Sequence, residues 1–163
     1  MPLEPAVTDL EQLKTHPALA RLMERDAAAV EGAKFDRDEM TMVIARVFLR
    51  EACSLLKLDL GFTFLADLTA VDWYPSEPRF EVVYHLLSMQ HKERLRLKVK
   101  LAGDDAQVES VTGVWPAANF FEREVYDLFG IRFTGHPNLR RIMMPEDWEG
   151  HPLRKDYPVE GYR

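Results

Sequence analysis

Residues 93–101 alternate strictly between aliphatic and basic side chains, which is the clearest pattern in the chain. In an extended strand successive side chains point to opposite faces, so the two kinds separate completely. The aliphatic set is Leu95, Leu97, Val99 and Leu101, and the basic set is Arg94, Arg96, Lys98 and Lys100. We therefore predict a strand with one face in a core and the other outside it.

Weaker alternations and runs of β-branched and aromatic residues predict four further strands, at residues 27–35, 40–45, 62–72 and 79–88. Pro75 and Pro78 mark a turn before the last of these. The short polar stretch 90–92 then joins residues 79–88 to residues 93–101. Two strands with so short a connection form an antiparallel hairpin.

Helical spacing of apolar residues predicts three helices, at residues 10–25, 47–58 and 117–129. Pro17 falls inside the first and can divide it into two pieces. The third has the clearest ends, because Pro116 suits a first helical turn and Gly130 suits a left-handed stop. Arg123 and Asp127 are four residues apart on it, and we predict that they pair on its surface.

The last segment, residues 131–163, has no sustained period, yet it is rich in large apolar and aromatic residues. Prolines and glycines interrupt it repeatedly, while a disordered tail would be poor in aromatic residues. One small domain cannot cover so many groups, each worth roughly 1.5–3 kcal/mol when buried. We predict an extended C-terminal arm whose apolar groups lie largely on another protein.

These elements define an α+β fold, in which a mixed or antiparallel sheet packs against helices. We assign residues 1–130 to this domain, with 1–34 poorly assigned, and residues 131–163 to the partner-binding arm. The chain has 163 residues, which fits one domain. Its net charge of −6 does not favour nucleic-acid binding.

The only cysteine, Cys53, excludes an internal disulfide and any cysteine-ligated cluster built by this chain alone. It lies in an apolar stretch, so we expect a small buried hydrophobe rather than a reactive thiol. The N-terminus lacks the pattern of a signal peptide, and no apolar run approaches 18 residues. We expect membrane contact only through partners.

Acidic and histidine residues gather around the third helix and the arm, which raises the possibility of a metal site. They include Glu122, Glu124, Asp127, His136, Glu146, Asp147 and His151. Glu122 and Glu124 do not face the same way on a helix, and His136 and His151 are 15 residues apart. We expect no metal site, because ion pairs between helix and arm explain the charges equally well, and no catalytic or nucleotide-binding motif occurs.

Two basic features remain open to two readings each. The basic face of residues 93–101 suits a solvated sheet face, which we favour, or a docking surface for an acidic partner. In the arm, residues 139–145 and 152–158 interleave arginines with large apolar and aromatic groups. Such a mixture is typical of interface anchors, which we favour over a loop packed on its own fold.

Several stretches resemble the family of subunits C, also called the 30 kDa subunit family, of respiratory NADH–quinone oxidoreductase (complex I). They are EREVYDLF at 122–129, GHPNLRRIMMPEDWEGHPLRKDYP at 135–158, ADLTAVD at 66–72, FEVVYHLLS at 80–88 and WPAAN at 115–119. The resemblance covers roughly residues 60–161. It does not extend to residues 1–34, where the family varies.

The resemblance implies a cofactor-free structural subunit in the peripheral arm of the complex, on the cytoplasmic side of the inner membrane. Iron–sulfur clusters, FMN and quinone would belong to partner subunits. The chief partners would be the hydrogenase-like quinone-site subunit and two cluster-bearing subunits, which are named subunits D, B and I in that order. No residue of this chain would be catalytic, although the whole complex is a proton-pumping enzyme.

The resemblance and the composition of the arm together predict twelve partner-binding residues: Glu122, Arg123, Glu124, Asp127, His136, Arg140, Arg141, Trp148, His151, Arg154, Lys155 and Tyr157. One alternative is the same module in a related membrane-bound hydrogenase or a dehydrogenase with another electron donor. A stand-alone metal-dependent enzyme that uses His136 and His151 is the other.

Overall fold

The computed structural model describes residues 5–161. Met1–Glu4, on which the expected lack of a signal peptide partly rests, and Tyr162 in the arm lie outside the described residues. The elements in chain order are α1 (Leu10–Leu13), α2 (Pro17–Arg25), β1 (Val30–Asp36), β2 (Glu39–Ile44), α3 (Leu49–Leu60), β3 (Phe64–Asp72), β4 (Phe80–Ser88), β5 (Glu93–Leu101), β6 (Gln107–Glu109), α4 (Ala118–Phe129) and β7 (Arg132–Thr134).

The main sheet has five strands in the order β1-β2-β5-β4-β3. The neighbours are antiparallel except β2 and β5, which run parallel with Met40 opposite Leu95. The α+β class with a mixed sheet is therefore confirmed. The strand predicted at 93–101 is β5 with the same bounds.

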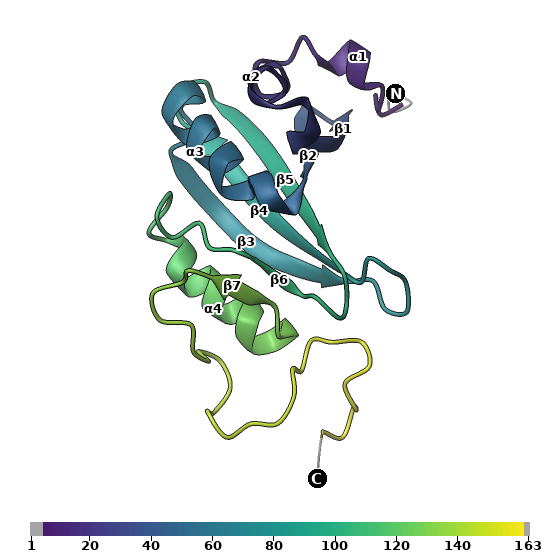
Figure 1. Cartoon of the computed structure of the whole chain (residues 1–163), viewed down its shortest axis with the longest axis vertical. Helices are drawn as coiled ribbons and strands as arrows, with labels where there is room; N and C mark the ends of the chain where they lie inside the picture. The colour runs from purple at the N-terminus through teal and green to yellow at the C-terminus, as the bar shows by residue number, and fades with distance from the viewer. Residues whose placement is uncertain (1–4, 162–163) are drawn as a thin grey trace.

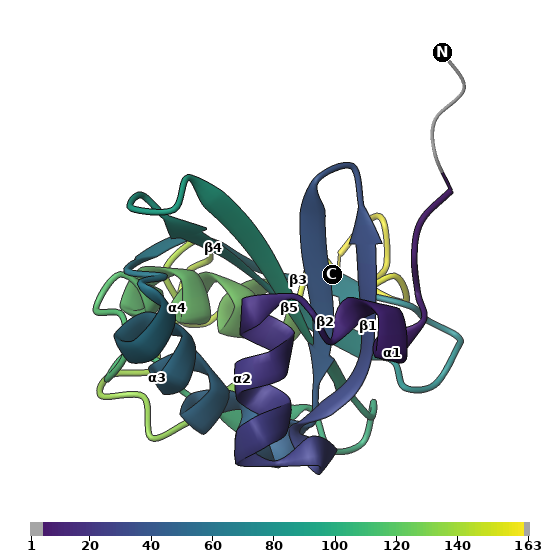
Figure 2. The same cartoon turned by 90° about the horizontal axis from the view of Figure 1, so that it is seen from above.

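Helices cover one face of this sheet. The aliphatic side chains of β5 are fully buried, together with Met40 and Met42 of β2 and Leu56 of α3. Figures 1 and 2 show α2 and α3 lying against the sheet, and α4 packs beside β3. Asp67 and Thr69 of β3 are exposed on the other face.

The N-terminal third differs in detail from the prediction. The helix expected at 10–25 is two helices, and Pro17 is the first residue of the second. The strand expected to begin at residue 27 begins at Val30, because residues 27–29 form a 3₁₀ turn. The Asp26 carboxylate accepts the Ala28 N–H there and stabilises the turn. The helix expected at 47–58 is α3, after another 3₁₀ turn.

Two short strands were not predicted. β6 and β7 are three residues each and pair in parallel, with Val108 opposite Phe133. β7 lies inside the segment assigned to the arm, so the first residues of that segment pair with the domain. Three residues are too few to show a period, which is why the pattern did not reveal either strand.

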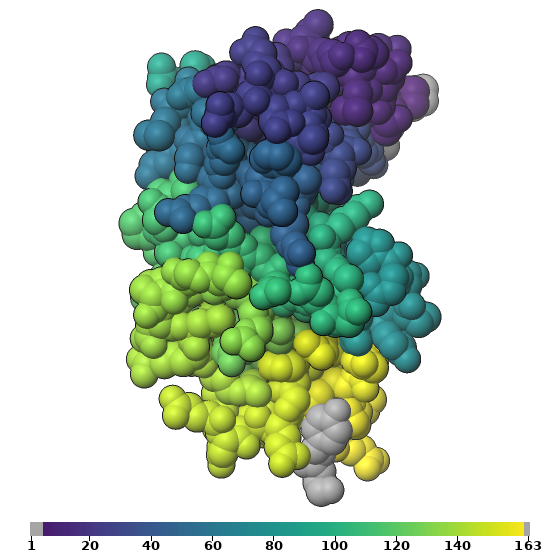
Figure 3. Space-filling model, viewed as in Figure 1, coloured from purple at the N-terminus to yellow at the C-terminus, as the bar shows by residue number. Residues whose placement is uncertain are grey.

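The C-terminal segment, residues 135–161, contains no helix or strand. Figure 1 shows it passing along the far side of α4 and then toward the end of β3, and Figure 3 shows that it forms one end of the molecule. None of the helices within residues 5–161 has the length and apolar character needed to cross a bilayer.

Candidate functional site

Helix α4 carries the side chains that organise the C-terminal segment. Its buried face includes Ala118, Glu122, Val125 and Phe129, which are spaced as one helical stripe. Asp127 is also buried. The helix ends at Gly130, whose φ of 75° is left-handed and whose N–H bonds the Tyr126 carbonyl. The two buried carboxylates have different surroundings.

The Asp127 carboxylate holds the middle of the C-terminal segment. Its Oδ2 accepts the backbone N–H groups of Ile142, Met143 and Met144 at 2.9, 2.7 and 2.9 Å, and its Oδ1 accepts the Arg141 guanidinium at 2.6 Å. Burial alone would raise the pKa of Asp127, but these hydrogen bonds favour the ionised form and lower the pKa overall. Asp127 is therefore a fixed negative charge at neutral pH.

The surface pair predicted between Arg123 and Asp127 is wrong. Arg123 instead donates to the carbonyl oxygens of Arg140 and Arg141, 17 and 18 residues along the chain. Asp127 is fully buried and bonds Arg141. The spacing of four residues on a helix allowed the pair, but the arm supplies better donors.

The last carbonyls of α4 are satisfied by the same segment. Arg141 and His151 donate to the Asp127 carbonyl at 3.1 and 2.9 Å, and Arg154 donates to that of Phe129 at 2.6 Å. The Leu153 N–H bonds the Leu128 carbonyl at 3.0 Å. Cationic groups favour a helix C-terminus, where carbonyl dipoles point outward. Burial lowers the pKa of His151, so it acts as a neutral donor through Nδ1.

A second anchor joins the segment to the sheet. Arg79, at the start of β4, donates to Asp72 of β3 at 2.9 and 3.0 Å and to Asp156 at 2.6 and 3.0 Å. The Lys155 N–H also bonds Asp72 at 2.9 Å. Burial alone would raise the pKa of Asp72, but the bonds from Arg79, Lys155 and Tyr74 lower it to about 2.

The segment leaves apolar groups in water although its polar groups are bound. Met143 is 63% exposed and Trp148 is 39% exposed. Ile142, Leu153 and Val159 are exposed as well. The segment thus folds back on its own domain through hydrogen bonds, while much of its apolar surface stays uncovered.

The structure separates the predicted partner-binding residues into two groups. Those that bond the chain itself around α4 are Glu122, Arg123, Asp127, His136, Arg141, His151 and Arg154. Glu124, Arg140, Trp148 and Lys155 are exposed, and Tyr157 is half-buried with its hydroxyl on the Glu149 carbonyl. Only the exposed group has side chains available to a partner without rearrangement.

Glu122 belongs to a buried polar network at the other end of α4. Its carboxyl accepts the Val111 N–H at 2.7 Å and bonds the Ser110 hydroxyl at 2.6 Å. His136 Nε2 lies 3.9 Å from the carboxyl and donates to the Asn119 carbonyl. Burial raises the pKa of Glu122 to about 7, and the two hydrogen bonds offset only part of that effect.

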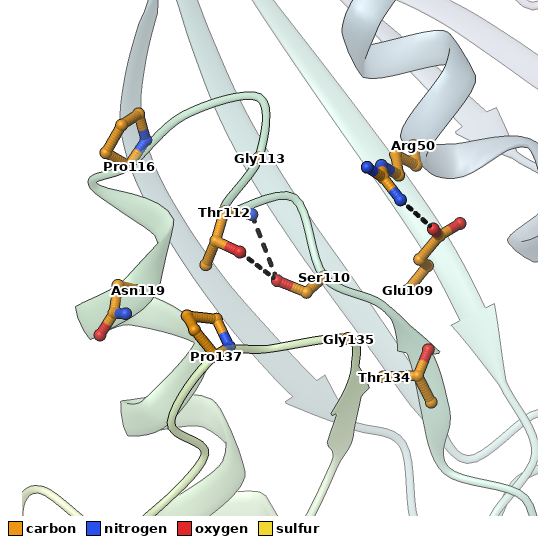
Figure 4. A pocket seen from close by; sticks show the side chains of 10 residues that line it. All are labelled: Arg50, Glu109, Ser110, Thr112, Gly113, Pro116, Asn119, Thr134, Gly135 and Pro137. Atoms are coloured by element: carbon orange, nitrogen blue, oxygen red, sulfur yellow. Dashed lines mark hydrogen bonds and ion pairs between the residues drawn. The ribbon is translucent and has the colours of Figure 1, made fainter.

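A pocket of about 400 Å³ opens directly over Ser110 (Figure 4). Its walls come from α3, β6, the loop after β6, the start of α4, the end of β7 and the residues after it: Arg50, Glu109, Ser110, Thr112, Gly113, Pro116, Asn119, Thr134, Gly135 and Pro137. Sequence reasoning did not identify this pocket, because its residues are polar, scattered and part of no motif. The sequence feature that could have indicated the pocket was Glu122, an acidic residue on the otherwise apolar stripe of α4.

The histidines considered for a metal site bond backbone carbonyls. His136 and His151 donate to the carbonyls of Asn119 and Asp127. Among residues 5–161, no group of three or more histidine, cysteine, aspartate or glutamate residues is placed to hold a metal ion. Cys53 is buried in α3, and burial raises the pKa of its thiol. The predicted lack of cofactors remains a prediction.

Comparison with known families gives one family match over most of the chain. Residues 42–163 match the family described as the 30 kDa subunit of the respiratory-chain NADH dehydrogenase. Similar curated proteins include the subunits C of the NADH-quinone oxidoreductases of two bacteria. That of Citrifermentans bemidjiense is 46% identical over 88% of this chain and 89% of its own. That of Geobacter sulfurreducens is 47% identical over 88% of this chain and 90% of its own.

Two solved structures share the fold. One is a trypsin-resistant fragment of Nqo5, with a TM-score of 0.65 and 35% identity over 75% of this chain and 99% of that one. The other is a chain of the archaeal membrane-bound sulfane sulfur reductase, a respiratory membrane complex. It has a TM-score of 0.75 and 28% identity over 90% of this chain and 86% of that one.

Proposed function

We infer the function from one premise: this chain belongs to the family of the 30 kDa subunit of the respiratory-chain NADH dehydrogenase. Other subunits of that complex are therefore its partners. We propose that the chain is a cofactor-free structural subunit of the peripheral arm, on the cytoplasmic side of the inner membrane. It fixes the hydrogenase-like quinone-site subunit relative to the cluster-bearing subunits B and I.

The observation that carries this proposal is the contrast within the C-terminal segment. Its backbone is held by Asp127 and by the Asp72–Arg79–Asp156 network, while Met143 and Trp148 remain exposed. A partner that covers these side chains gains hydrophobic contact without the cost of ordering a free chain. A rigid segment with an apolar outer surface suits a subunit whose task is to position neighbours.

The segment therefore binds this domain on one side and contacts the partner subunits on the other. Trp148 and Arg140 offer the aromatic and guanidinium groups that dominate binding at interfaces. The proposal assigns electron transfer and quinone chemistry to the other subunits.

A pair of matched substitutions tests the proposal. Met143 in the segment is 63% exposed, and Met89 in the β4–β5 turn is 69% exposed. Met143→Asp places a charge where a partner would bury the side chain. We therefore expect the amount of partner recovered with the variant to fall about tenfold or more. Met89→Asp is the control and should copurify like the parent chain.

The measurement is the amount of each partner recovered with a tagged chain expressed in its own cells. Equal recovery with both variants would refute the role of the segment. Recovery of no respiratory subunit with the parent chain would refute the proposed function itself. Both variants should have the circular dichroism spectrum of the parent, since both side chains are exposed.

The likeness to the sulfane sulfur reductase chain favours a second candidate function, the same module in a complex with another electron donor. The purified complex separates the two candidates. NADH oxidation coupled to quinone reduction supports the first, and reduction of quinone or sulfur compounds without NADH supports the second.

A further inference from the structure

We propose that the pocket over Ser110 receives a basic side chain, lysine or arginine, of a partner subunit. The inference rests on the proposed function, because it needs a partner that docks beside the C-terminal segment. It concerns a site that the segment does not cover.

The chemistry of the walls favours a hydrogen-bond donor. The lining includes oxygen atoms of Glu109, Thr112 and Thr134. The Thr134 hydroxyl donates its proton to the Val108 carbonyl, so its oxygen can still accept. Among the described residues that line the pocket, Arg50 is the only cation, and it is engaged with Glu109 Oε1 at 2.8 Å (Figure 4). That ion pair uses one carboxylate oxygen of Glu109 and leaves the other free to accept. Because Arg50 and Glu109 offset each other's charge, the walls hold no net positive charge that would attract an anion.

A buried acid lies behind the pocket. Glu122 is fully buried, and its carboxyl bonds the Ser110 hydroxyl, which contacts the Thr112 hydroxyl at 2.9 Å. The hydroxyls thus link the carboxyl to the cavity. A cation placed there interacts with Glu122 through an interior where charges are weakly screened. An ionised Glu122 attracts a cation in this position and repels an anion.

The other groups that face Glu122 do not replace such a cation. Cys53 of α3 and Tyr84 of β4 are fully buried, and burial raises the pKa of both, so neither is charged at neutral pH. His136 donates its Nε2 proton to the Asn119 carbonyl and accepts the Asn138 N–H at Nδ1, as a neutral imidazole does. None of these groups brings a positive charge to Glu122, so a cation in the pocket would have no competitor among them.

The pocket is open where a partner would approach. A Cβ built at Gly135 meets nothing within 4 Å, so the rim is clear. Thr134 is exposed, and Pro137 lies in the same chain segment that leads to the exposed Met143. A partner seated on the C-terminal segment therefore reaches the pocket without crossing other elements. The cavity of about 400 Å³ has room for a long side chain.

Charge substitution at Thr134 tests the proposal in the assembled complex. Thr134→Lys fills the pocket with the chain's own cation, so we expect copurification of partners to fall about tenfold or more. Thr69→Lys, at an exposed threonine of β3 on the open sheet face, is the matched control and should behave like the parent. Equal recovery with Thr134→Lys and Thr69→Lys would overturn the proposal.

Cross-linking identifies the occupant directly. Thr134→Cys supplies an accessible thiol, because the native Cys53 is buried. A benzophenone maleimide on it captures any nearby residue, and mass spectrometry of the cross-linked complex locates that residue. A lysine or arginine within two residues of the captured position supports the proposal. Capture near acidic or apolar residues alone, or capture of no partner, overturns it.

The outcomes also separate this proposal from the proposed function. If Met143→Asp releases the chain and Thr134→Lys does not, the chain is a subunit whose pocket has no basic occupant. If the parent chain copurifies with no respiratory subunit, the proposed function fails first.

Discussion

Two carboxylates only five residues apart on α4 have pKa values shifted in opposite directions. Asp127 accepts three backbone N–H groups and a guanidinium, which outweigh its burial and lower its pKa. Glu122 accepts one backbone N–H and one hydroxyl, which do not outweigh its burial, and its pKa rises to about 7. The balance between burial and the hydrogen bonds that each carboxylate accepts decides the sign of the shift.

The shift of Glu122 predicts a pH dependence of stability. Its proton is bound more tightly in the folded chain, so the stabilisation is complete below about pH 4.5 and is lost as the pH rises through about 7. A pKa raised from 4.5 to about 7 corresponds to roughly 3 kcal/mol. Glu122→Gln removes the titration, so we expect the free energy of unfolding to change less between pH 5 and 8 than in the parent.

Urea denaturation of both chains at pH 5, 6.5 and 8 measures this difference. The lowered pKa of His151 gives the opposite slope near pH 6.5, but it is common to both chains and cancels in the difference. Asp72 and Asp127, with lowered pKa values, titrate below this window. Glu124→Gln, on the exposed side of the same helix, is the control. An identical slope for parent and Glu122→Gln would show that Glu122 is ionised throughout.

At the scale of single residues, the burial of Glu122 could be predicted from the sequence, but the hydrogen-bond partners of Asp127 could not. Glu122 falls on the stripe formed by Ala118, Val125 and Phe129, so helical spacing alone predicts a buried acid. The donors of Asp127 lie 14 to 17 residues away in a segment without a period. Nothing in local spacing favours those partners over Arg123, which is why the predicted pair was wrong.

Among the elements, the turn that ends α4 is the most tightly constrained. A Cβ at Gly130 would lie 2.5 Å from Arg154 Nη2 and 2.6 Å from the His151 ring, and φ is 75°. Gly135 has nearly the same φ, 78°, with nothing within 4 Å. The two glycines therefore differ in crowding and not in backbone conformation.

Alanine substitution at these glycines separates strain from crowding. We expect Gly135→Ala to lower the free energy of unfolding by about 1 kcal/mol, the cost of a left-handed alanine. Gly130→Ala should lower the free energy of unfolding by roughly 2 kcal/mol more than Gly135→Ala does, because Arg154 and His151 must leave the α4 carbonyls. Equilibrium urea unfolding measures both. Equal losses would mean that the arm moves aside freely.

Elements whose apolar residues recur at strand or helix spacing were predictable from the sequence, and elements without such a pattern were not. β5 was predicted residue for residue because its two faces differ completely in chemistry. α4 and the split at Pro17 followed from proline and glycine positions. β6 and β7 are held by a distant partner strand and have no signature of their own. Tertiary pairing decides such short strands.

The whole molecule is a two-layer domain with a segment bound along one end (Figure 3). Two polar anchors, at Asp127 and at Arg79, hold that segment, and each uses a charged group of the domain. The prediction of an extended arm whose apolar groups lie largely on another protein came from composition, and it stays a prediction. Ion pairs between the helix and the arm were predicted in outline, but the individual bonds were not, because single residues far apart in sequence supply them.

Removing one anchor should release the middle of the segment and leave the sheet intact. Asp127→Asn loses the charge that three backbone N–H groups share, so we expect trypsin to cleave after Arg140 and Arg141 about tenfold faster or more. Mass spectrometry of timed digests identifies the sites. Glu124→Gln should digest like the parent, and unchanged cleavage in Asp127→Asn would show that the Arg79 anchor suffices.

The parallel pairing of β2 with β5 has a consequence for synthesis of the chain. Met40, Met42 and Ile44 leave the ribosome long before Leu95 and Leu97, beside which β2 is fixed. The outer edge of β2 must therefore wait without its partner strand while β3 and β4 are made. The β3–β4–β5 meander is local in sequence and can assemble first, so the N-terminal hairpin should dock late, and nascent chains stalled before residue 95 are the ones that need a chaperone.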